Sequence, residues 1–285
     1  MRKRTKPVDG ITNAESGNSA ASLTRGLAIL RAFTIEDATL GNQELIERTG
    51  LPKATISRLT STLVGLGYLH YDDALGRYSI GPATVSLGYS ALSSNAVIHL
   101  ARPLMQKLAD ETGAAVALGT RDGLEMVYLA NCRSNSPVSL RLNVGSRLPI
   151  WRTAMGLAYL AEMTPHIRIS VMQELMQSDP DDAERIQISV QDALQQREAS
   201  GFVAGFGVWF SYINAIGVAF RPTDGSPLIA LTCGGIVDIL PRERCRDVVG
   251  PALVHLTQRL RAQLAGHETP QSTALLPSSW KTTAE

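Results

Sequence analysis

The chain has 285 residues, of which 44% are hydrophobic and 19% are charged, with 27 Lys and Arg against 26 Asp and Glu. This is the composition of a globular protein of about two domains, and no apolar run approaches the ~18 residues of a membrane span. The basic start, Met1 to Lys6, has no apolar stretch behind it, so we expect no secretory signal and a cytoplasmic protein. The three cysteines and five histidines lack the close spacings of zinc ligands, so neither a metal nor a cofactor is expected.

The N-terminal segment is polar and poor in large apolar groups, so residues 1–21 are expected to be a disordered tail. Ser22 is a suitable helix N-cap, and apolar residues at helical spacing follow it. We therefore expect a first supporting helix whose inward face carries Leu23, Leu27, Leu30 and Phe33.

The stretch from Asn42 to Ile80 is typical of a winged helix-turn-helix, a domain expected over residues 22–81. A short helix capped by Asn42 should end just before Gly50, because glycine tolerates the positive φ of a helix C-cap. Pro52 suits the first turn of the helix that follows.

The second helix of this motif has two different faces. Steps of three, four and three residues predict an inward apolar face of Ile56, Leu59, Leu63 and Leu66. The opposite face is small, hydroxylated and basic, without a carboxylate, which suits a helix that enters the major groove of DNA. The residues expected to contact DNA there are Lys53, Ala54, Thr55, Ser57, Arg58 and Ser61, with Arg58 as the base reader. An ordinary amphipathic helix has the same pattern, so the prediction depends on the preceding helix, the turn and the hairpin that follows.

Residues 68–80 predict a two-stranded wing with its turn at residues 72–76, where Gly76 takes a left-handed position. Arg77 is expected at the wing tip, in contact with the phosphate backbone. Because Asp72 and Asp73 oppose strong attraction to phosphate, the wing is expected to position the domain rather than to read sequence.

A connecting helix should follow the wing, within a linker expected over residues 82–98. Its candidates for burial are Val85, Leu87, Tyr89 and Leu92. Three of these, Val85, Leu87 and Leu92, are equally candidates for a dimer interface. A longer helix is expected from Asn95 to Thr112, where Gly113 ends it.

The second domain, expected over residues 99–265, combines strands and helices. Strands are expected at residues 115–120, 124–130, 138–142, 213–220 and 228–232, and helices at 153–163, 167–176, 190–199 and 242–264. Helices packed on a mainly antiparallel sheet give an α+β domain. The Ser/Thr/Pro-rich residues 266–285 are expected to be a disordered tail.

The chain resembles the isocitrate-lyase-regulator (IclR) family of bacterial transcription regulators. The segments that carry the resemblance are SLTRGLAIL from Ser22, IERTGLPKATISRLTSTLVGLGYL from Ile46 and GRYSIGP from Gly76, with further likeness in LARPLMQKLADETG, VGSRLPIWRTAMGLAYLAE and INAIGVAF. The resemblance spans residues 22–264 and implies a winged helix-turn-helix joined by a linker helix to a GAF/PAS-like α+β effector-binding domain. It also implies a repressor or activator, here expected to serve a catabolic operon, that binds double-stranded DNA and a small organic acid.

A single winged helix makes too few contacts for the ~10⁻⁸ to 10⁻¹¹ M affinity of specific DNA binding. Two-fold pairing doubles the contacts and predicts a near-palindromic operator. The resemblance implies a homodimer, often a dimer of dimers, with no membrane partner.

The effector site is expected at the helix that begins at Thr153. Free backbone N–H groups and the helix dipole at such a start favour an anion, and the resemblance places the family's pocket there too. The residues expected to form it are Thr153, Ala154, Met155, Trp209, Asn214, Ala215, Thr232 and Cys233. Leu157 replaces the family's usual basic residue and Gly205–Trp209 replaces an acidic segment, so a less polar acid, aromatic or larger than two carbons, is favoured. The alternative is that Thr153 only caps its helix and Asn214 faces solvent.

No catalytic motif is present: the sequence has no GxSxG elbow, Walker loop, GxGxxG after a strand, or HExxH. Cys233 has no identifiable base, so a buried and inert thiol is expected. The chain is therefore expected not to be an enzyme. The alternative is a small-molecule-binding or acyl-processing enzyme with an N-terminal assembly module, which a sequence-specific DNA footprint would exclude.

Overall fold

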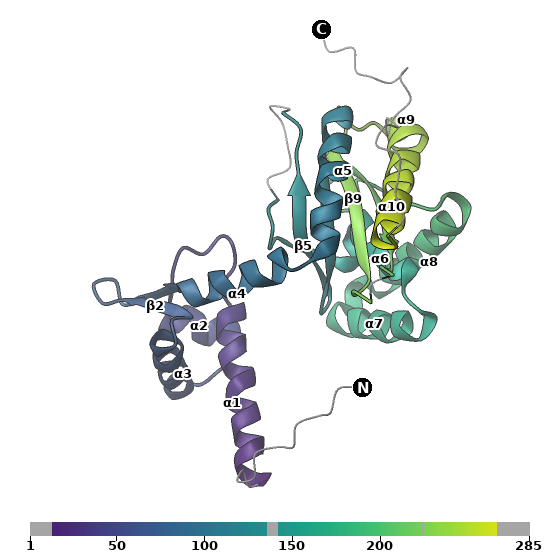
Figure 1. The fold of residues 1–285 in the computed structure, drawn as a ribbon. Helices are drawn as coiled ribbons and strands as arrows, with labels where there is room; N and C mark the ends of the chain where they lie inside the picture. Colours follow the sequence, from purple (N-terminus) through teal and green to yellow (C-terminus); the bar gives the residue numbers. More distant parts are fainter. Residues whose placement is uncertain (1–12, 136–141, 224, 267–285) are drawn as a thin grey trace, which may run out of the picture. The chain divides into compact units, whose positions relative to one another are not determined.

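The computed structural model describes residues 13–135, 142–223 and 225–266, and it divides between Leu92 and Ser93 into two compact units (Figure 1). This division falls inside the predicted linker. The tails predicted at residues 1–21 and 266–285 lie mostly outside the described residues, as does most of the strand predicted at 138–142. Residues 13–21 are helical, so the predicted disorder is wrong for that part of the first tail.

The N-terminal unit is a winged helix-turn-helix. Its three-stranded antiparallel sheet has the order β1-β3-β2. Its elements are α1 (Asn13–Arg31), β1 (Leu40–Gly41), α2 (Asn42–Thr49), α3 (Lys53–Gly65), β2 (Leu69–Asp72), β3 (Arg77–Ile80) and α4 (Pro82–Ser93). The turn and the wing are as predicted, since Gly50 and Gly76 both have positive φ, 67° and 62°.

The first helix differs from the prediction in its start and its inward face. It begins at Asn13, so Ser22 lies within it rather than capping it. Leu23 and Leu27 are 65% and 50% exposed, whereas Ile29 is fully buried. The other two predicted residues, Leu30 and Phe33, do pack against the core cluster that contains Ile29, so the prediction is wrong for Leu23 and Leu27 only.

Two details of α2 and α3 also correct the prediction. Gly41 rather than Asn42 is the N-cap of α2, and the Glu44 carboxylate accepts its backbone N–H at 2.6 Å. Leu66 follows the end of α3 and is 62% exposed, because the helix stops one residue earlier. Thr60 is buried instead, and its hydroxyl donates to Ile56 O at 2.9 Å.

The connecting helix α4 buries none of its side chains within the chain. Val85, Leu87 and Tyr89 are 66%, 63% and 72% exposed, so their predicted burial within the subunit is wrong. An isolated 12-residue helix is marginal in water, and here the first turn of α4 is tied to the wing, where the Thr84 hydroxyl donates to Tyr68 O at 3.1 Å. Val85, Leu87 and Tyr89 form an exposed apolar surface on this helix.

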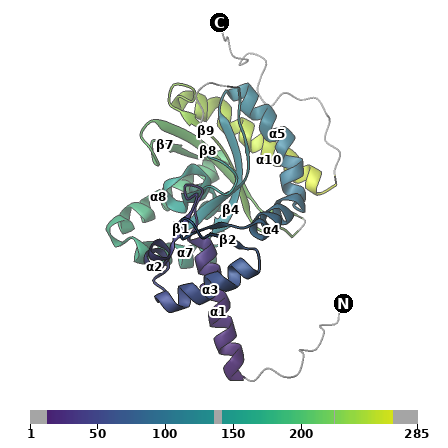
Figure 2. The ribbon, with the colours of Figure 1, turned by 90° about the vertical axis from the view of Figure 1, so that its left-hand side faces the viewer.

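The C-terminal unit confirms the α+β prediction. A six-stranded antiparallel sheet of order β6-β5-β4-β9-β8-β7 carries α5 and α10 on one face (Figure 2) and packs against α6 on the other. Its strands are β4 (Ala115–Asp122), β5 (Glu125–Cys132), β6 (Arg147–Pro149), β7 (Val203–Phe206), β8 (Ile213–Phe220) and β9 (Ile229–Ile236). Its helices are α5 (Ala96–Thr112), η1 (Ile150–Arg152), α6 (Ala154–Glu162), α7 (Pro165–Ser178), η2 (Pro180–Asp182), α8 (Ala183–Ser200), α9 (Arg242–Arg244), η3 (Cys245–Val249) and α10 (Gly250–Leu264).

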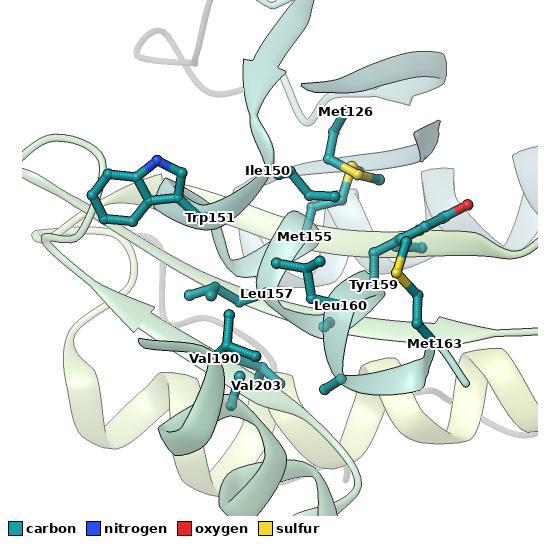
Figure 3. Close-up of a cluster of buried hydrophobic side chains, with 14 of the residues drawn as sticks. Met126, Ile150, Trp151, Met155, Leu157, Tyr159, Leu160, Met163, Val190 and Val203 are labelled. Carbon is teal, nitrogen blue, oxygen red and sulfur yellow. The ribbon is translucent and has the colours of Figure 1, made fainter. Parts of the chain in front are cut away.

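Helix α6 lies very close to the sheet because glycines stand where the two meet. A Cβ added at Gly217 of β8 would lie 2.2 Å from Ala154 O, and one at Gly119 of β4 would lie 2.7 Å from Met155 Sδ. The apolar core of this unit forms around α6, with Leu157 and Leu160 among Ile150, Val190 and Val203 (Figure 3). The glycines thus fix the height of the α6 start above the strands. In the described parts of the chain, no helix is both long and apolar enough to cross a membrane.

Candidate functional site

The outward face of α3 is free to meet a partner. Five of the residues predicted to contact DNA are exposed, and Thr55 is half-buried: the exposed ones are Lys53, Ala54, Ser57, Arg58 and Ser61. Among the described residues, the charged ends of Lys53 and Arg58 have no hydrogen-bond or ion-pair partner. Unpaired cations on an exposed helix favour a polyanion, because neutralising phosphates releases counterions.

Arg77 does not stand free at the wing tip, which corrects the prediction. It begins β3, and its guanidinium donates to Thr39 Oγ1 at 2.8 Å and to Glu44 Oε1 at 3.0 Å. The Glu44 carboxylate also holds the start of α2, so Arg77 ties the wing to the helix-turn-helix. At the turn, the Asp72 carboxylate accepts the N–H groups of Ala74 and Leu75.

The C-terminal unit contains a cavity of about 50 Å³ between the start of α6 and the sheet. Six of the eight residues predicted for the ligand site line it: Thr153, Ala154, Met155, Trp209, Ala215 and Thr232. Thr153 is the N-cap of α6, and its hydroxyl accepts the N–H of Gly156 at 3.2 Å. The described chain supplies no acceptor to the N–H groups of Ala154 and Met155.

The other two predicted ligand residues face away from the cavity. Asn214 is buried and donates to Leu240 O at 2.8 Å. The Cys233 thiol is fully buried beside the Thr112 hydroxyl, at 3.8 Å. Adjacent residues of a strand point to opposite faces, so Ala215 and Thr232 can line the cavity only if Asn214 and Cys233 do not. Asn214 is also not solvent-facing, which was the alternative.

Sequence reasoning missed two polar residues that line the cavity, Arg152 and Asn131. Arg152 precedes the cap of α6, and its guanidinium lies 5.3 Å from the centre of the Trp151 ring. Its Nε is buried without a hydrogen-bond partner in the described chain, and so is Oδ1 of Asn131 on β5. The position of Arg152 immediately before Thr153 was a usable signal, whereas nothing in the sequence singles out Asn131.

None of the three thiols is placed to act as a nucleophile. Cys132, Cys233 and Cys245 are buried and unpaired. Burial raises the pKa of the Cys233 thiol to about 12 and that of Cys245 to about 11, which keeps both protonated at neutral pH. Within the described ranges, no group of three or more His, Cys, Asp or Glu side chains could hold a metal ion.

A winged helix with an unpaired basic face and a second domain with a polar-ended cavity together define a ligand-responsive DNA-binding protein. Comparison with known proteins makes this assignment specific. The IclR helix-turn-helix domain matches residues 22–73, and the bacterial transcriptional regulator IclR C-terminal domain matches residues 89–257. The chain belongs to the IclR family of bacterial transcriptional regulators.

Two of its relatives are named as regulators. It is 34% identical to the HTH-type transcriptional regulator TsaQ1/TsaQ2 of Comamonas testosteroni, over 90% of this chain and 93% of that protein. The Pca regulon regulatory protein of Pseudomonas putida is 29% identical, over 86% of this chain and 84% of that protein.

Solved structures agree in fold. An IclR family transcriptional regulator from Brucella abortus is 36% identical with a TM-score of 0.79, over 89% of this chain and 96% of that chain. An IclR homologue from Microbacterium hydrocarbonoxydans, complexed with 4-hydroxybenzoate, is 21% identical with a TM-score of 0.66, over 86% of this chain and 99% of that chain.

Proposed function

We propose that this regulator is controlled by a small organic acid, whose carboxylate binds at the start of α6 beside Arg152. The observation that carries the proposal is the buried Nε of Arg152 in the cavity wall, which has no hydrogen-bond partner among the described residues. The N–H groups of Ala154 and Met155, to which the same part of the chain supplies no acceptor, add the positive end of a helix dipole. An arginine fork and a helix start together suit a planar carboxylate better than a neutral group.

The rest of the cavity favours an apolar ligand body of limited size. Leu142, Leu148, Trp209 and Ile213 contribute apolar walls, and the buried Tyr128 has a raised pKa, so its hydroxyl stays neutral. The volume of about 50 Å³ is well below the ~150 Å³ of a cavity that binds benzene. An aromatic acid therefore requires a shift of one wall, and Trp209, on the loop between β7 and β8, is a half-buried wall residue that such a shift would involve.

Assembly as a homodimer on a near-palindromic operator is the second part of the proposal. Leu23 and Leu27 on α1 and Val85, Leu87 and Tyr89 on α4 are large apolar side chains exposed to solvent. A second copy of the chain would cover them and would place two α3 helices on two half-sites. The regulator would act in the cytoplasm, on genes for the breakdown of its acid.

Thermal unfolding of the full chain with a panel of carboxylic acids of increasing size tests the effector site. An acid at a hundred times its dissociation constant should add about 2.7 kcal/mol to the free energy of unfolding. Arg152→Gln should weaken that acid by ten-fold or more, because a hydrogen bond to a charged group contributes about 1.5–3 kcal/mol.

Arg221→Gln is the matched control, since Arg221 is exposed and does not line the cavity. Equal affinity of the wild-type chain and Arg152→Gln for a stabilising acid would contradict the proposed site. An absence of stabilisation by every acid in the panel would contradict the proposed class of effector.

A further inference from the structure

The side-chain amide of Asn131 is held in one orientation. Its Nδ2 donates to Leu142 O at 2.5 Å, and the guanidinium of Arg133 donates to the same carbonyl oxygen. Rotating the amide by half a turn would bring Oδ1 against that carbonyl, where two acceptors repel. Oδ1 therefore stays on the opposite side of the amide, buried and without a donor in the described residues.

The strand register places this amide at the far end of the cavity from the α6 start. Asn131 pairs with Ala117, Ala117 with Thr232, and Thr232 with Gly217, so these four residues form one row across β5, β4, β9 and β8. Residues paired in this way point to the same face of a sheet. Ala154 rests on Gly217 at one end of the row, and Asn131 is at the other end. Three strand spacings of ~4.8 Å, about 14 Å in all, separate the Cα atoms of Gly217 and Asn131.

The two ends of the cavity thus differ in the kind of hydrogen-bond partner that is missing. Among the described residues, Arg152 Nε, beside the α6 start, is a donor without an acceptor, and Asn131 Oδ1, on β5, is an acceptor without a donor. These two atoms do not satisfy each other. Buried polar groups in native proteins are almost always hydrogen-bonded, so a ligand that satisfies both atoms completes the site.

We infer that the cavity selects an acid that carries a hydrogen-bond donor, a hydroxyl or amino group, at the end away from its carboxylate, and that Asn131 accepts that donor. This inference rests on the proposed carboxylate position at α6. A ligand without the donor would bury Asn131 Oδ1 with no partner. Sites built around such a hydrogen bond reject the analogue that lacks it far more strongly than a hydrophobic pocket rejects a missing methylene.

Two matched ligand pairs test the inference by isothermal titration of the full-length chain: 4-hydroxybenzoate against benzoate, and 4-hydroxybutanoate against butanoate. Within whichever pair binds, the wild-type chain should prefer the hydroxylated acid by at least ten-fold. In Asn131→Leu this preference should disappear, chiefly through weaker binding of the hydroxylated acid. Arg133 still donates to Leu142 O in this variant, which keeps the carbonyl satisfied.

Asn143→Leu is the matched control, because Asn143 lies next to Leu142 but does not line the cavity, and it should keep the preference. Circular dichroism checks the fold, and Asn131→Ala replaces Asn131→Leu if the latter does not fold. Equal binding within a pair by the wild-type chain, or a preference that persists without the Asn131 amide, would overturn the inference and leave the proposed acid site standing. Failure of all four acids, and of the wider acid panel, to bind would overturn the proposed effector class and the inference with it.

Discussion

At the residue scale, cations with a carboxylate partner can be separated from cations without one. Five arginines pair with acidic side chains: Arg48, Arg77, Arg147, Arg185 and Arg197. Lys53, Arg58 and Arg152 have no such partner among the described residues, and each lies on a surface proposed to meet an anion. Sequence alone cannot make this distinction for most of these arginines, because their partners are distant along the chain, as Glu44 is from Arg77; only Arg185 pairs locally, with Asp182.

We predict that Arg58 reads a base and that Lys53 contacts phosphate. Arg58→Ala should cost about 1–3 kcal/mol on the operator and much less on random duplex, because an arginine–guanine pair discriminates by that amount. Lys53→Ala should weaken both duplexes alike and lower the salt dependence of binding. Fluorescence anisotropy on both duplexes at several salt concentrations measures these effects. An equal loss on the two duplexes for Arg58→Ala would identify Arg58 as a phosphate contact.

The ligand-site residues show which details of a site can be predicted from strand patterns in the sequence. The positions of β8 and β9 follow from their apolar runs and turn residues, and the start of α6 follows from Thr153. The face of the sheet toward which a single side chain points does not follow from these patterns, because a shift of one residue along a strand reverses it. Both residues of two adjacent pairs were predicted to line the ligand site: Asn214 and Ala215, and Thr232 and Cys233. One residue of each pair, Asn214 and Cys233, faces away from it.

At the element scale, the seating of α6 on the sheet depends on glycine. We predict that Gly217→Ala destabilises the C-terminal unit by about 1–3 kcal/mol, because the added methyl would overlap the Ala154 carbonyl and force a backbone shift. The same shift should move the helix start and weaken any effector bound there. Urea unfolding gives the loss of stability. The control is Gly65→Ala in α3, where no atom lies within 4 Å of the added methyl and no loss of stability is expected.

The start of α2 should respond to acid. The N–H of Gly41, followed by Arg77, lowers the pKa of Glu44 below its ordinary value of 4.5. A carboxyl whose pKa is lowered by folding stabilises the folded state above its ordinary pKa, and this contribution is lost as the pH falls through the lowered value. The protection factors of the Gly41 and α2 amides against hydrogen exchange should therefore fall more between neutral pH and about pH 3 in the wild-type chain than in Glu44→Gln. Parallel pH profiles for the two proteins would show that Glu44 does not hold this helix start.

The elements that sequence predicted well are those with two agreeing signals. Periodicity together with a turn or cap residue located α3, the wing, α5 and the β4–β5 hairpin. Strands β1, β6 and β7 were missed because they have two to four residues and take their place from pairing with distant strands. The N-terminal seven residues of α8 were missed because their sequence, AERIQIS, carries little apolar periodicity.

At the scale of the whole molecule, the sequence was enough to predict two domains and the fold class of each. The assembly cannot be read from one chain, because its contacts are made by a second copy. We predict a dimer or larger assembly by light scattering at micromolar concentration, against a subunit mass of 30.6 kDa. A charged substitution, Leu87→Glu, should shift the equilibrium toward monomer, since Leu87 is 63% exposed in the subunit. Ile188→Glu is a control at an apolar residue of similar exposure on α8. A monomeric wild-type chain, or equal masses for all three proteins, would contradict this prediction.

The unpacked helix α4 has a consequence for the lifetime of the protein. If only a partner subunit covers α4, then a subunit diluted below its dimerisation constant holds residues 82–93 as a fraying helix between two folded domains. Such a segment is an accessible substrate for proteases, which cut extended chain. At such low concentrations the regulator would be severed at the linker, and the pool of DNA-binding subunits would be limited by degradation as well as by synthesis.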